Sequence, residues 1–406
     1  MYWLRVMSAL ALTLLALSTT GLSSASTVFL ELLWQSVDDQ VDSYTHVMAY
    51  GRIYYVIGSR GGYLVVSKID RASPDVIERL VFERVAGRSL YILDSVLEAD
   101  AIRVLAAVDE GGSAVLYFIT VSLAAPRVSV DSTISLPRGI TIVYGSIWGG
   151  SSLVVAVSGD ALVASKISPR EVEWTIQLPD ATLFKPSACI ALRRDGVAVV
   201  AFSASHGLSV ALVSPAGSLL RILNYNTSTP IIPYDCSCLD LALLVAGSIV
   251  VGESYHPILI YMTTEEPVKA GHSIGDTRGA FSALVADSGR VYATAVTEQG
   301  VLIARYSFSL EAGFRLEKVA NLTQVANREV IALALARLDS TIAVAGAIAN
   351  DKSAYLALLR EVEELKLTEF IAPALIATSL IALAILVAAV AITVFRKRRR
   401  MRSQMD

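Results

Sequence analysis

The chain has 406 residues, of which 54% are hydrophobic and only 17% are charged, and its formal net charge is −3. Soluble domains contain about 25% charged residues on average, so part of this chain belongs in an apolar environment. Basic residues gather at the C-terminus and leave the rest of the chain acidic. Nucleic-acid binding requires a basic surface, and the composition therefore argues against a nucleic-acid partner.

The N-terminal segment, residues 1–26, has the pattern of a secretory signal peptide. Arg5 precedes an apolar run over residues 6–17, and Ser23-Ser24-Ala25 fits a small-x-small cleavage site. An uncleaved anchor is the competing interpretation, but this run is short compared with the roughly 20 residues that a spanning helix needs. We therefore predict export and cleavage.

The C-terminal segment, residues 370–395, predicts a transmembrane helix because it contains no charged side chain. A helix of this length rises about 39 Å, enough to cross a hydrocarbon core of about 30 Å. The tail at 396–406 is strongly basic, and such clusters stay on the cytoplasmic side. We expect a type I protein of the cell membrane, with its bulk outside and a juxtamembrane linker at 361–369.

The middle of the chain, residues 27–360, is a repeat of short Val-, Ile-, Tyr- and Ala-rich runs separated by Gly, Asp, Ser and Pro. Equivalent inner strands are predicted to begin near Arg52, Ala101, Ser151, Gly196, Leu241, Arg290 and Ser340. A period of about 45–50 residues is that of a four-stranded propeller blade. The sequence therefore predicts an all-β fold, a seven-bladed β-propeller outside the membrane.

The last repeat unit, residues 329–362, contains only three predicted strands. Residues 28–36 offer the missing outer strand, and their Trp34 resembles Trp174 in the outer strand predicted at 171–178. We predict that the N-terminal strand closes the ring, because closure removes the exposed edges of an open array.

The repeat pattern over residues 28–360 resembles that of β-propeller repeat proteins, nearest in style to quinoprotein-like repeats. The WD dipeptide pattern is absent, and the tryptophan series of cofactor-binding quinoproteins is replaced by Trp34, Trp148 and Trp174 alone. The resemblance implies the fold, and it implies no cofactor and no activity.

The histidines are His46, His206, His256 and His272, and their spacing does not match a metal site. We place His206 and His256 in the turns between the second and third strands of neighbouring blades, where they could meet on one rim. The alternative is that both are ordinary exposed turn residues. We predict no metal.

Two charged groups are predicted to be surface features. Asp38, Asp39 and Asp42 do not have the spacing of a calcium loop, so we expect a solvated acidic loop. Arg193 and Arg194 precede a turn between two strands and are predicted to be surface charges.

The three cysteines, Cys189, Cys236 and Cys238, are too few for a disulfide framework or a four-thiolate zinc site. Export permits a disulfide. Cys236 and Cys238 are separated by about 6.6–6.8 Å along a strand, near the upper limit for bridging. A bridge from Cys189 to one of them is the better candidate and leaves one thiol free.

Candidate binding residues surround the connection at 224–235, the longest that we predict between blades. Tyr225 and Tyr234 flank it and offer flat contact surfaces, and with His206 and His256 they form the predicted ligand site. Asn226 and Asn321 begin N-glycosylation sequons, both between an outer strand and the next blade. The alternative is that the connection is only a glycosylated spacer.

These features favour a membrane-anchored cell-surface module that binds a ligand, a glycan or a partner protein on the face turned away from the bilayer. The alternative is an extracytoplasmic enzyme, such as a polysaccharide lyase, hydrolase or dehydrogenase, with its site at the propeller mouth; its catalytic residues are unknown from sequence. A structural role in an envelope layer is a third possibility. Two or more acids with a His or Tyr at the channel mouth would favour the enzyme, and an aromatic patch on a rim would favour binding.

Overall fold

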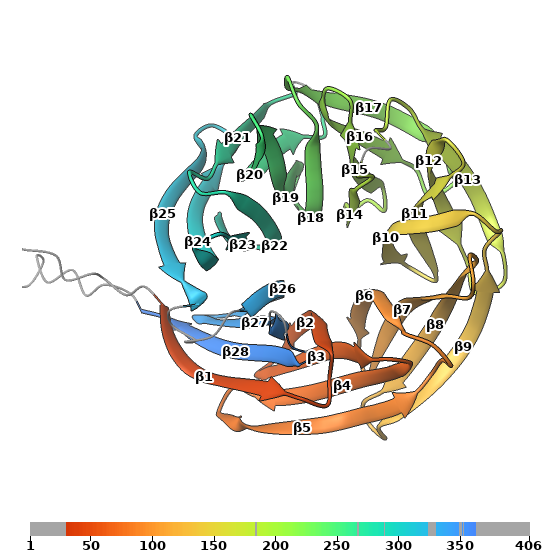
Figure 1. The fold of residues 1–406 in the computed structure, drawn as a ribbon, viewed down its shortest axis with the longest axis vertical. Coiled ribbons are helices and arrows are strands. Elements are labelled where there is room, and N and C mark those ends of the chain that lie inside the picture. The colour runs from red at the N-terminus through yellow and green to blue at the C-terminus, as the bar shows by residue number, and fades with distance from the viewer. Residues whose placement is uncertain are drawn as a thin grey trace, which may run out of the picture. The chain divides into compact units, whose positions relative to one another are not determined.

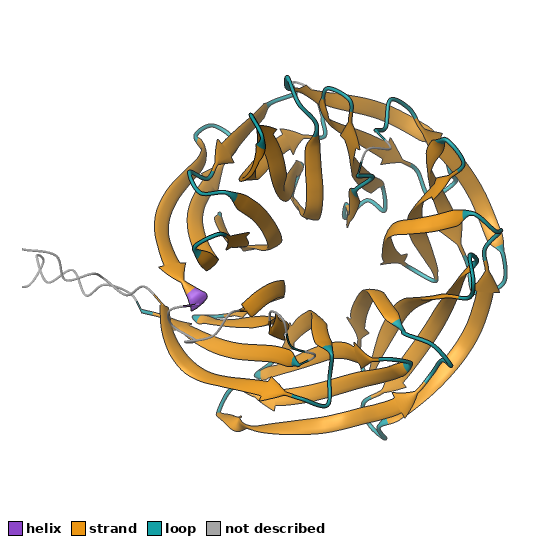
Figure 2. Ribbon diagram, viewed as in Figure 1, coloured by secondary structure: helices purple, strands orange, loops and turns teal. Residues whose placement is uncertain are grey.

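The computed structural model describes residues 30–362, except for 183–184, 266–267, 288, 324–329, 349–350 and 352. Nearly all regular structure in this part of the chain is β-strand (Figure 2). Apolar runs alternate with tight turns in which the backbone φ is positive, for example 61° at Gly51 and 54° at Asp339. Gly adopts this conformation freely and Asp tolerates it, so these residues end one strand and reverse the chain into the next.

The strands form seven four-stranded antiparallel sheets, arranged as the blades of a ring (Figure 1). Blade 1 comprises β2 (Ser43–Tyr50), β3 (Ile53–Arg60), β4 (Tyr63–Asp70) and β5 (Ser73–Arg84). Blade 2 comprises β6 (Tyr91–Glu98), β7 (Ala101–Asp109), β8 (Ala114–Ser122) and β9 (Arg127–Ser135). Blade 3 comprises β10 (Ile140–Trp148), β11 (Ser151–Ser158), β12 (Ala161–Ile167) and β13 (Val172–Leu178). Blade 4 comprises β14 (Ala188–Leu192), β15 (Ala198–Ala204), β16 (Gly207–Val213) and β17 (Leu219–Asn226).

Blade 5 comprises β18 (Ile231–Leu239), β19 (Ala242–Val251), β20 (Ser254–Thr263) and β21 (Ala270–Ile274). Blade 6 comprises β22 (Gly279–Asp287), β23 (Arg290–Thr297), β24 (Gly300–Ser309) and β25 (Gly313–Asn321). Blade 7 comprises β26 (Val330–Leu338), β27 (Thr341–Ile348), β28 (Ala354–Glu361) and the N-terminal β1 (Leu30–Asp38). The predicted seven-bladed β-propeller is thereby confirmed.

The strands that we predicted as inner are the second strands of the blades. β3, β7, β11, β15, β19, β23 and β27 begin within two residues of the predicted positions. They lie one place out from the channel, second in each blade, and their predicted starting positions are confirmed. All seven residues of β15 are buried, because a neighbouring blade covers each face of the sheet. A strand covered on both faces is continuously apolar, which is why these runs stand out in the sequence.

The ring is closed by β1, which pairs antiparallel with β28 from Leu30 opposite Glu361 to Asp38 opposite Ala354. Trp34 packs against the apolar cluster between blades 7 and 1. The first and last strands of the ring thus share one sheet, and the outer edge of β28 is covered (Figure 1).

The hydrophobic core is divided among the boundaries between blades. Ile57 of blade 1 and Val104 of blade 2 belong to one buried cluster, and Tyr44 of blade 1 and Leu356 of blade 7 belong to another. Each blade is therefore stabilised chiefly by its two neighbours, as in other repeat architectures.

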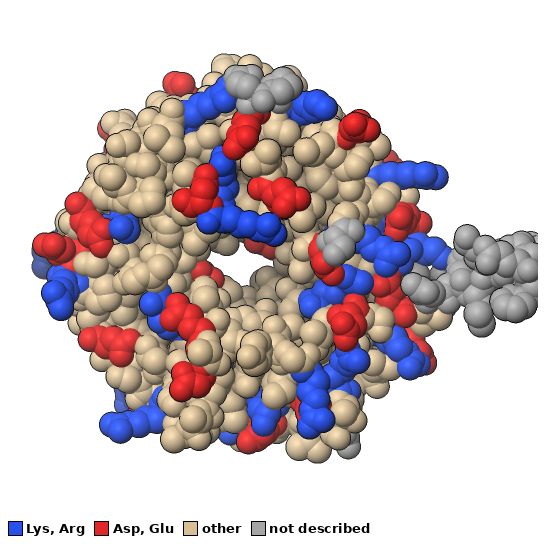
Figure 3. Space-filling model, turned by 180° about the vertical axis from the view of Figure 1, so that it is seen from behind, with Lys and Arg blue, Asp and Glu red and all other residues tan. Residues whose placement is uncertain are grey.

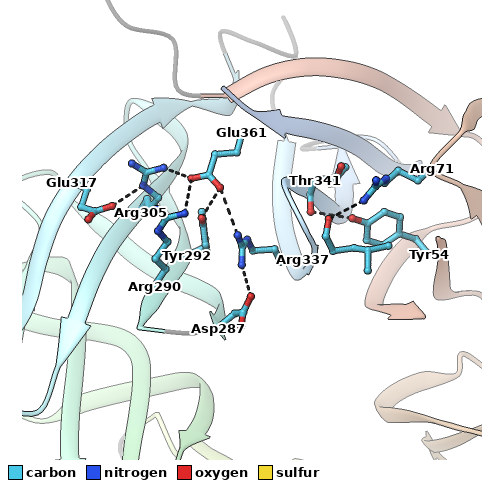
Figure 4. Close-up of polar contacts among 11 residues, drawn as sticks. Tyr54, Arg71, Asp287, Arg290, Tyr292, Arg305, Glu317, Arg337, Thr341 and Glu361 are labelled. Carbon is cyan, nitrogen blue, oxygen red and sulfur yellow. Dashed lines mark hydrogen bonds and ion pairs between the residues drawn. The ribbon is translucent and has the colours of Figure 1, made fainter. Parts of the chain in front are cut away.

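Polar contacts fasten the closing blade to its neighbours (Figure 4). The Glu361 side chain is only 3% exposed, accepts a hydrogen bond from the Tyr292 hydroxyl at 2.9 Å, and pairs with Arg305 of blade 6. On the other side, the Tyr54 hydroxyl of blade 1 donates to the Thr341 carbonyl at 3.0 Å. A buried carboxylate without partners would be strongly destabilising, so Glu361 depends on this cluster.

The predicted signal peptide at 1–26, the predicted span at 370–395 and the basic tail at 396–406 lie outside the described residues. Within the described part of the chain, we find no helix with the length and hydropathy required to cross a membrane. Leu30–Glu361 forms one compact unit.

Candidate functional site

The two faces of the ring carry different connections. We name each face after its turns. The B–C face holds the turns between the second and third strands of each blade and the connections from one blade to the next. The A–B face holds the turns between first and second strands and between third and fourth strands. Leu30 and Glu361 are opposite each other where β1 begins and β28 ends, so both ends of the ring lie on the A–B face.

The central channel is lined by the first strands of all seven blades and has a volume of about 510 Å³. Figure 3 shows one opening of this channel, with both acidic and basic side chains around it. Six first strands have a β-bulge at the same place, and the unpaired residues are Thr45, Leu93, Val143, Tyr234, Ser282 and Leu333. All six of these residues line the channel.

The residue after the bulge is polar in four blades, and we call these residues the channel set: His46, Asp94, Tyr144 and Asp235. Blades 6 and 7 have alanine at the same position. The channel set gathers two acids, a histidine and a tyrosine from strands that are far apart in the sequence. This is the combination that would favour an enzyme, so its hydrogen bonding decides how it is interpreted.

Asp94 of β6 is bonded to the next blade. Its Oδ2 accepts hydrogen bonds from the Ser146 hydroxyl at 2.9 Å and from the Ile147 N–H at 2.7 Å, both in β10. Its Oδ1 accepts from the Ser95 N–H at 2.7 Å. The carboxylate therefore satisfies a backbone donor of β10, the channel strand of the next blade, and it links blade 2 to blade 3.

Asp235 of β18 repeats this contact three blades further along. Its Oδ2 accepts from the Leu284 N–H of β22 at 2.8 Å and links blade 5 to blade 6. Burial raises the pKa of Asp235 to about 6, and repulsion from Asp94 acts in the same direction. The hydrogen bonds from the backbone oppose this shift but do not cancel it.

Burial also shifts the pKa values of the other two members of the channel set, His46 and Tyr144. Burial lowers the pKa of His46, whose Nδ1 lies 3.0 Å from the Thr45 hydroxyl. The pKa of Tyr144 is raised well above its ordinary value, first by burial and then by Asp235 and Asp94. The two acids thus act as struts between blades, which indicates a structural role more directly than a catalytic one.

A second hollow, the blade 2–3 groove, lies on the B–C face and has a volume of about 540 Å³. Its lining includes Tyr91, Asp109, Gly112, Ser113, Gly139 and Ile140. The floor is formed by two turns that hydrogen-bond to each other, since the Gly139 N–H donates to the Gly112 carbonyl at 3.1 Å. Both glycines have positive φ and open space where a Cβ would stand. A ligand can therefore approach the backbone closely here.

The predicted site residues lie in blades 4 and 5, towards the B–C face, at different distances from the channel. Tyr225 is in the outermost strand β17, and its hydroxyl contacts His272 Nδ1 of blade 5. Tyr234 is the bulged residue of β18, is 43% exposed and lines the channel. β17 extends to Asn226 and β18 begins at Ile231, so the long connection predicted at 224–235 is wrong. The tyrosines are strand residues on opposite sides of the blades.

The two histidines of the predicted site are also placed separately. His206 lies in the turn between β15 and β16, as predicted, and its carbonyl accepts from the Thr227 N–H at 3.1 Å. His256 lies inside β20, so its placement in a turn was wrong. Its Nδ1 is 3.3 Å from the Gly275 carbonyl oxygen. Among the described residues, these four side chains do not line one common pocket.

The cysteines join two blades. Cys189 of β14 and Cys236 of β18 form a disulfide with a Cα–Cα distance of 5.8 Å. Cys238 is free and partly buried, and burial raises its pKa to about 11. A thiol with such a pKa stays protonated at neutral pH and is a poor nucleophile.

The two predicted glycosylation sites differ in their surroundings. Asn226 is exposed at the end of β17. Asn321 ends β25, and its Nδ2 donates to the Gln299 carbonyl at 3.1 Å. Thr323 of the same sequon accepts from the Val301 N–H at 2.8 Å. Both asparagines lie on the B–C face, and in the second sequon the side chains of both Asn321 and Thr323 are bound within the fold.

In each group predicted as surface charges, the first residue is bound more closely than the sequence suggested. The side chain of Asp38 is 10% exposed, accepts from the Tyr44 hydroxyl at 2.9 Å and pairs with Arg79, so it is not part of a solvated loop. Arg193 pairs with Glu265 at 3.1 Å and links blades 4 and 5, whereas Arg194 is 94% exposed.

No cluster of three or more His, Cys, Asp or Glu side chains suited to a metal ion occurs among the described residues. Neither the two struts nor Tyr91 and Asp109 belong to a motif recognisable in the sequence. A signal for the struts existed, because Asp94 and Asp235 each face the fifth residue of the second strand, Leu105 and Ala246. Aligning the repeats on these strands would have shown the two acids at one register position.

Neither a protein-family model nor a curated protein matches the chain. Among solved structures, the β-propeller domain of Nup133 from Vanderwaltozyma polyspora is 11% identical with a TM-score of 0.49, over 81% of this chain and 100% of that chain. The WD40 domain of SCAP from fission yeast is 9% identical with a TM-score of 0.39, over 82% and 96%. The β-propeller domain of the trilobed protease from Pyrococcus furiosus is 9% identical with a TM-score of 0.44, over 79% and 99%. Similarities this low carry no information about a ligand or an activity of this chain.

Proposed function

We propose that the chain is a single-pass cell-surface protein whose propeller binds a ligand or a partner protein through its B–C face. The observation that carries this proposal is the blade 2–3 groove, because it lies on the face opposite the two ends of the ring. Loops and turns held by a rigid scaffold are common binding surfaces, and pockets of about 300–1,000 Å³ suit small ligands.

The orientation follows from the short linker between the ring and the predicted span. Residues 362–369 extend over at most about 3.3–3.6 Å each. Such a linker keeps the A–B face near the bilayer and leaves the B–C face accessible from outside. The basic tail at 396–406 supports the cytoplasmic placement of the C-terminus.

The test blocks one face at a time. In a Cys238→Ser background, Arg138→Cys places a thiol in the exposed turn beside Gly139 on the B–C face, and Arg194→Cys places one on the A–B face. Each variant of the full chain, held in lipid nanodiscs, is modified with a polyethylene glycol maleimide and screened against defined glycans and metabolites. Blocking at position 138 should abolish retention of any probe that the unmodified protein holds. Loss of binding only on blocking position 194 would contradict the proposal.

One observation favours the alternative of an extracytoplasmic enzyme, namely the gathering of the channel set around a cavity of about 510 Å³. Against it, Asp94 and Asp235 are both occupied by backbone donors of the next blade. Conversion of a probe in the same screen, in place of its retention, would favour the enzyme.

A further inference from the structure

We infer that the blade 2–3 groove binds a neutral saccharide ring, with Tyr91 as the stacking surface and Asp109 as the hydrogen-bond acceptor. This inference rests on the proposed function and names the class of ligand. Tyr91 is the first residue of β6 and is 60% exposed. An aromatic ring with that much free surface at the edge of a cavity provides a flat apolar platform with a polar tip.

The remaining walls match a ring that is apolar on one face and hydroxylated at its edge. Leu93, Ile140 and Ile142 supply half-buried apolar surface. Ser113 and Thr141 supply hydroxyl groups, and the bare backbone at Gly112 and Gly139 lets ligand hydroxyls reach peptide groups. Sites for small ligands are typically built in this way, mostly apolar with a few convergent polar groups.

The charge of the groove lining disfavours acidic ligands. Asp109 is the charged side chain among the described residues that line it, and neither Lys nor Arg is among them. Asp109 is held in place, because its Oδ1 accepts from the Gly112 N–H at 3.0 Å, and its exposed carboxylate can still accept from ligand hydroxyl groups. A sulfated or carboxylated sugar would be repelled by this carboxylate, so a neutral saccharide is favoured.

The chain offers a matched control for the stacking residue. Tyr50 is also 60% exposed, but it ends β2 and lies on the A–B face. Tyr91→Ala and Tyr50→Ala therefore remove the same exposed side chain from opposite faces. Thr141→Trp is a third variant, which fills the groove from β10 while all its other lining residues are retained.

The full chain in nanodiscs is applied to an array of neutral and acidic saccharides, and melting temperatures are measured for every variant. We expect retention of a neutral saccharide by the natural protein and by Tyr50→Ala, and at least about a tenfold loss of affinity for Tyr91→Ala and Thr141→Trp. Asp109→Asn keeps an acceptor for Gly112 and should weaken binding less than Tyr91→Ala does.

Three results would overturn the inference: binding of acidic saccharides only, binding that survives both Tyr91→Ala and Thr141→Trp, or no saccharide binding at all. If saccharides fail but metabolites bind and are blocked at position 138, the proposed function stands and the ligand class is wrong. If the binding of every probe is lost only when position 194 is blocked, both the proposed function and the proposed ligand class are wrong.

Discussion

At the scale of single residues, Asp94 and Asp235 occupy equivalent positions after the bulge in blades 2 and 5, but their surroundings differ. Asp94 accepts two hydrogen bonds from blade 3, whereas the contact of Asp235 with blade 6 is the single bond from Leu284. Hydrogen bonds to a carboxylate favour its charged form, and burial disfavours it. Burial prevails at Asp235, whose pKa is raised to about 6.

This raised pKa predicts a pH-dependent stability. The folded protein binds the Asp235 proton more tightly than the unfolded chain, where the pKa is 3.8. Protonated Asp235 therefore stabilises the folded state fully below pH 3.8, and this stabilisation is lost as the pH rises to about 6. It amounts to about 1–3 kcal/mol at 1.36 kcal/mol per pKa unit, allowing for water in the channel. Asp235→Asn, which keeps an acceptor for Leu284, should remove this loss.

Chemical denaturation of the propeller, residues 30–361, at pH 4.5 and 7.5 provides the measurement. The free energy of unfolding of Asp235→Asn, relative to the natural protein, should be higher at pH 7.5 than at pH 4.5. Asp240→Asn is the matched control, because Asp240 follows the same strand but is 74% exposed in its side chain. Equal pH dependence in the natural protein and in Asp235→Asn would show that burial does not hold this proton.

At the scale of elements, the strand that matters most is β1, since it is the only strand that joins chain segments from opposite ends of the ring within the described residues. Its contacts are backbone pairing along the whole of β28, the packing of Trp34, and an ion pair between Glu31 and Arg360 at 2.5 Å. The exposed ion pair contributes little, so pairing and apolar burial carry the closure.

Deleting residues 30–38 should therefore expose the edge and the apolar face of β28. We expect the melting temperature to fall by at least about 10 °C, because several kcal/mol are lost and each shifts Tm by about 2–4 °C in a domain of this size. Aggregation is expected as well, since open strand edges pair between molecules. Leu33→Ala is the control, because Leu33 lies in the bulge of β1 and is 37% exposed. Unchanged melting of the deletion variant would mean that blade 7 is stable with three strands.

At the scale of the whole molecule, the ring is a series of boundaries between neighbours, and charged residues strengthen several of them on the A–B face. Arg193 links blades 4 and 5, Glu361 links blades 6 and 7, and Arg71 of blade 1 pairs with Asp339 of blade 7 at 2.7 Å. The face near the ends of the ring is thus tied together, while the B–C face carries the groove.

The proposed topology puts the whole propeller outside the membrane and the C-terminal tail inside the cell. Protease added to intact cells should degrade the propeller and leave intact a tag fused after Asp406, because the basic tail holds the C-terminus in the cytoplasm. Immunoblotting for the tag before and after permeabilisation measures this. Removal of the tag from intact cells would reverse the orientation.

The sequence alone was sufficient for the fold, down to the first residues of the second strands and the closing role of the N-terminal strand. These features depend on local properties, since the alternation of apolar runs with Gly- and Asp-containing turns is set within about ten residues. The repeat period then fixed the number of blades.

The tertiary structure alone decided the sites. Gly112 and Gly139 belong to turns that meet across a blade boundary, and Asp94 meets Ile147 across a sequence separation of 53 residues. These contacts depend on the angle and register between blades, and hydrophobic periodicity in the sequence carries no information about either. For the same reason Tyr225 and Tyr234, close neighbours in the chain, lie on the outer strand of one blade and the channel strand of the next.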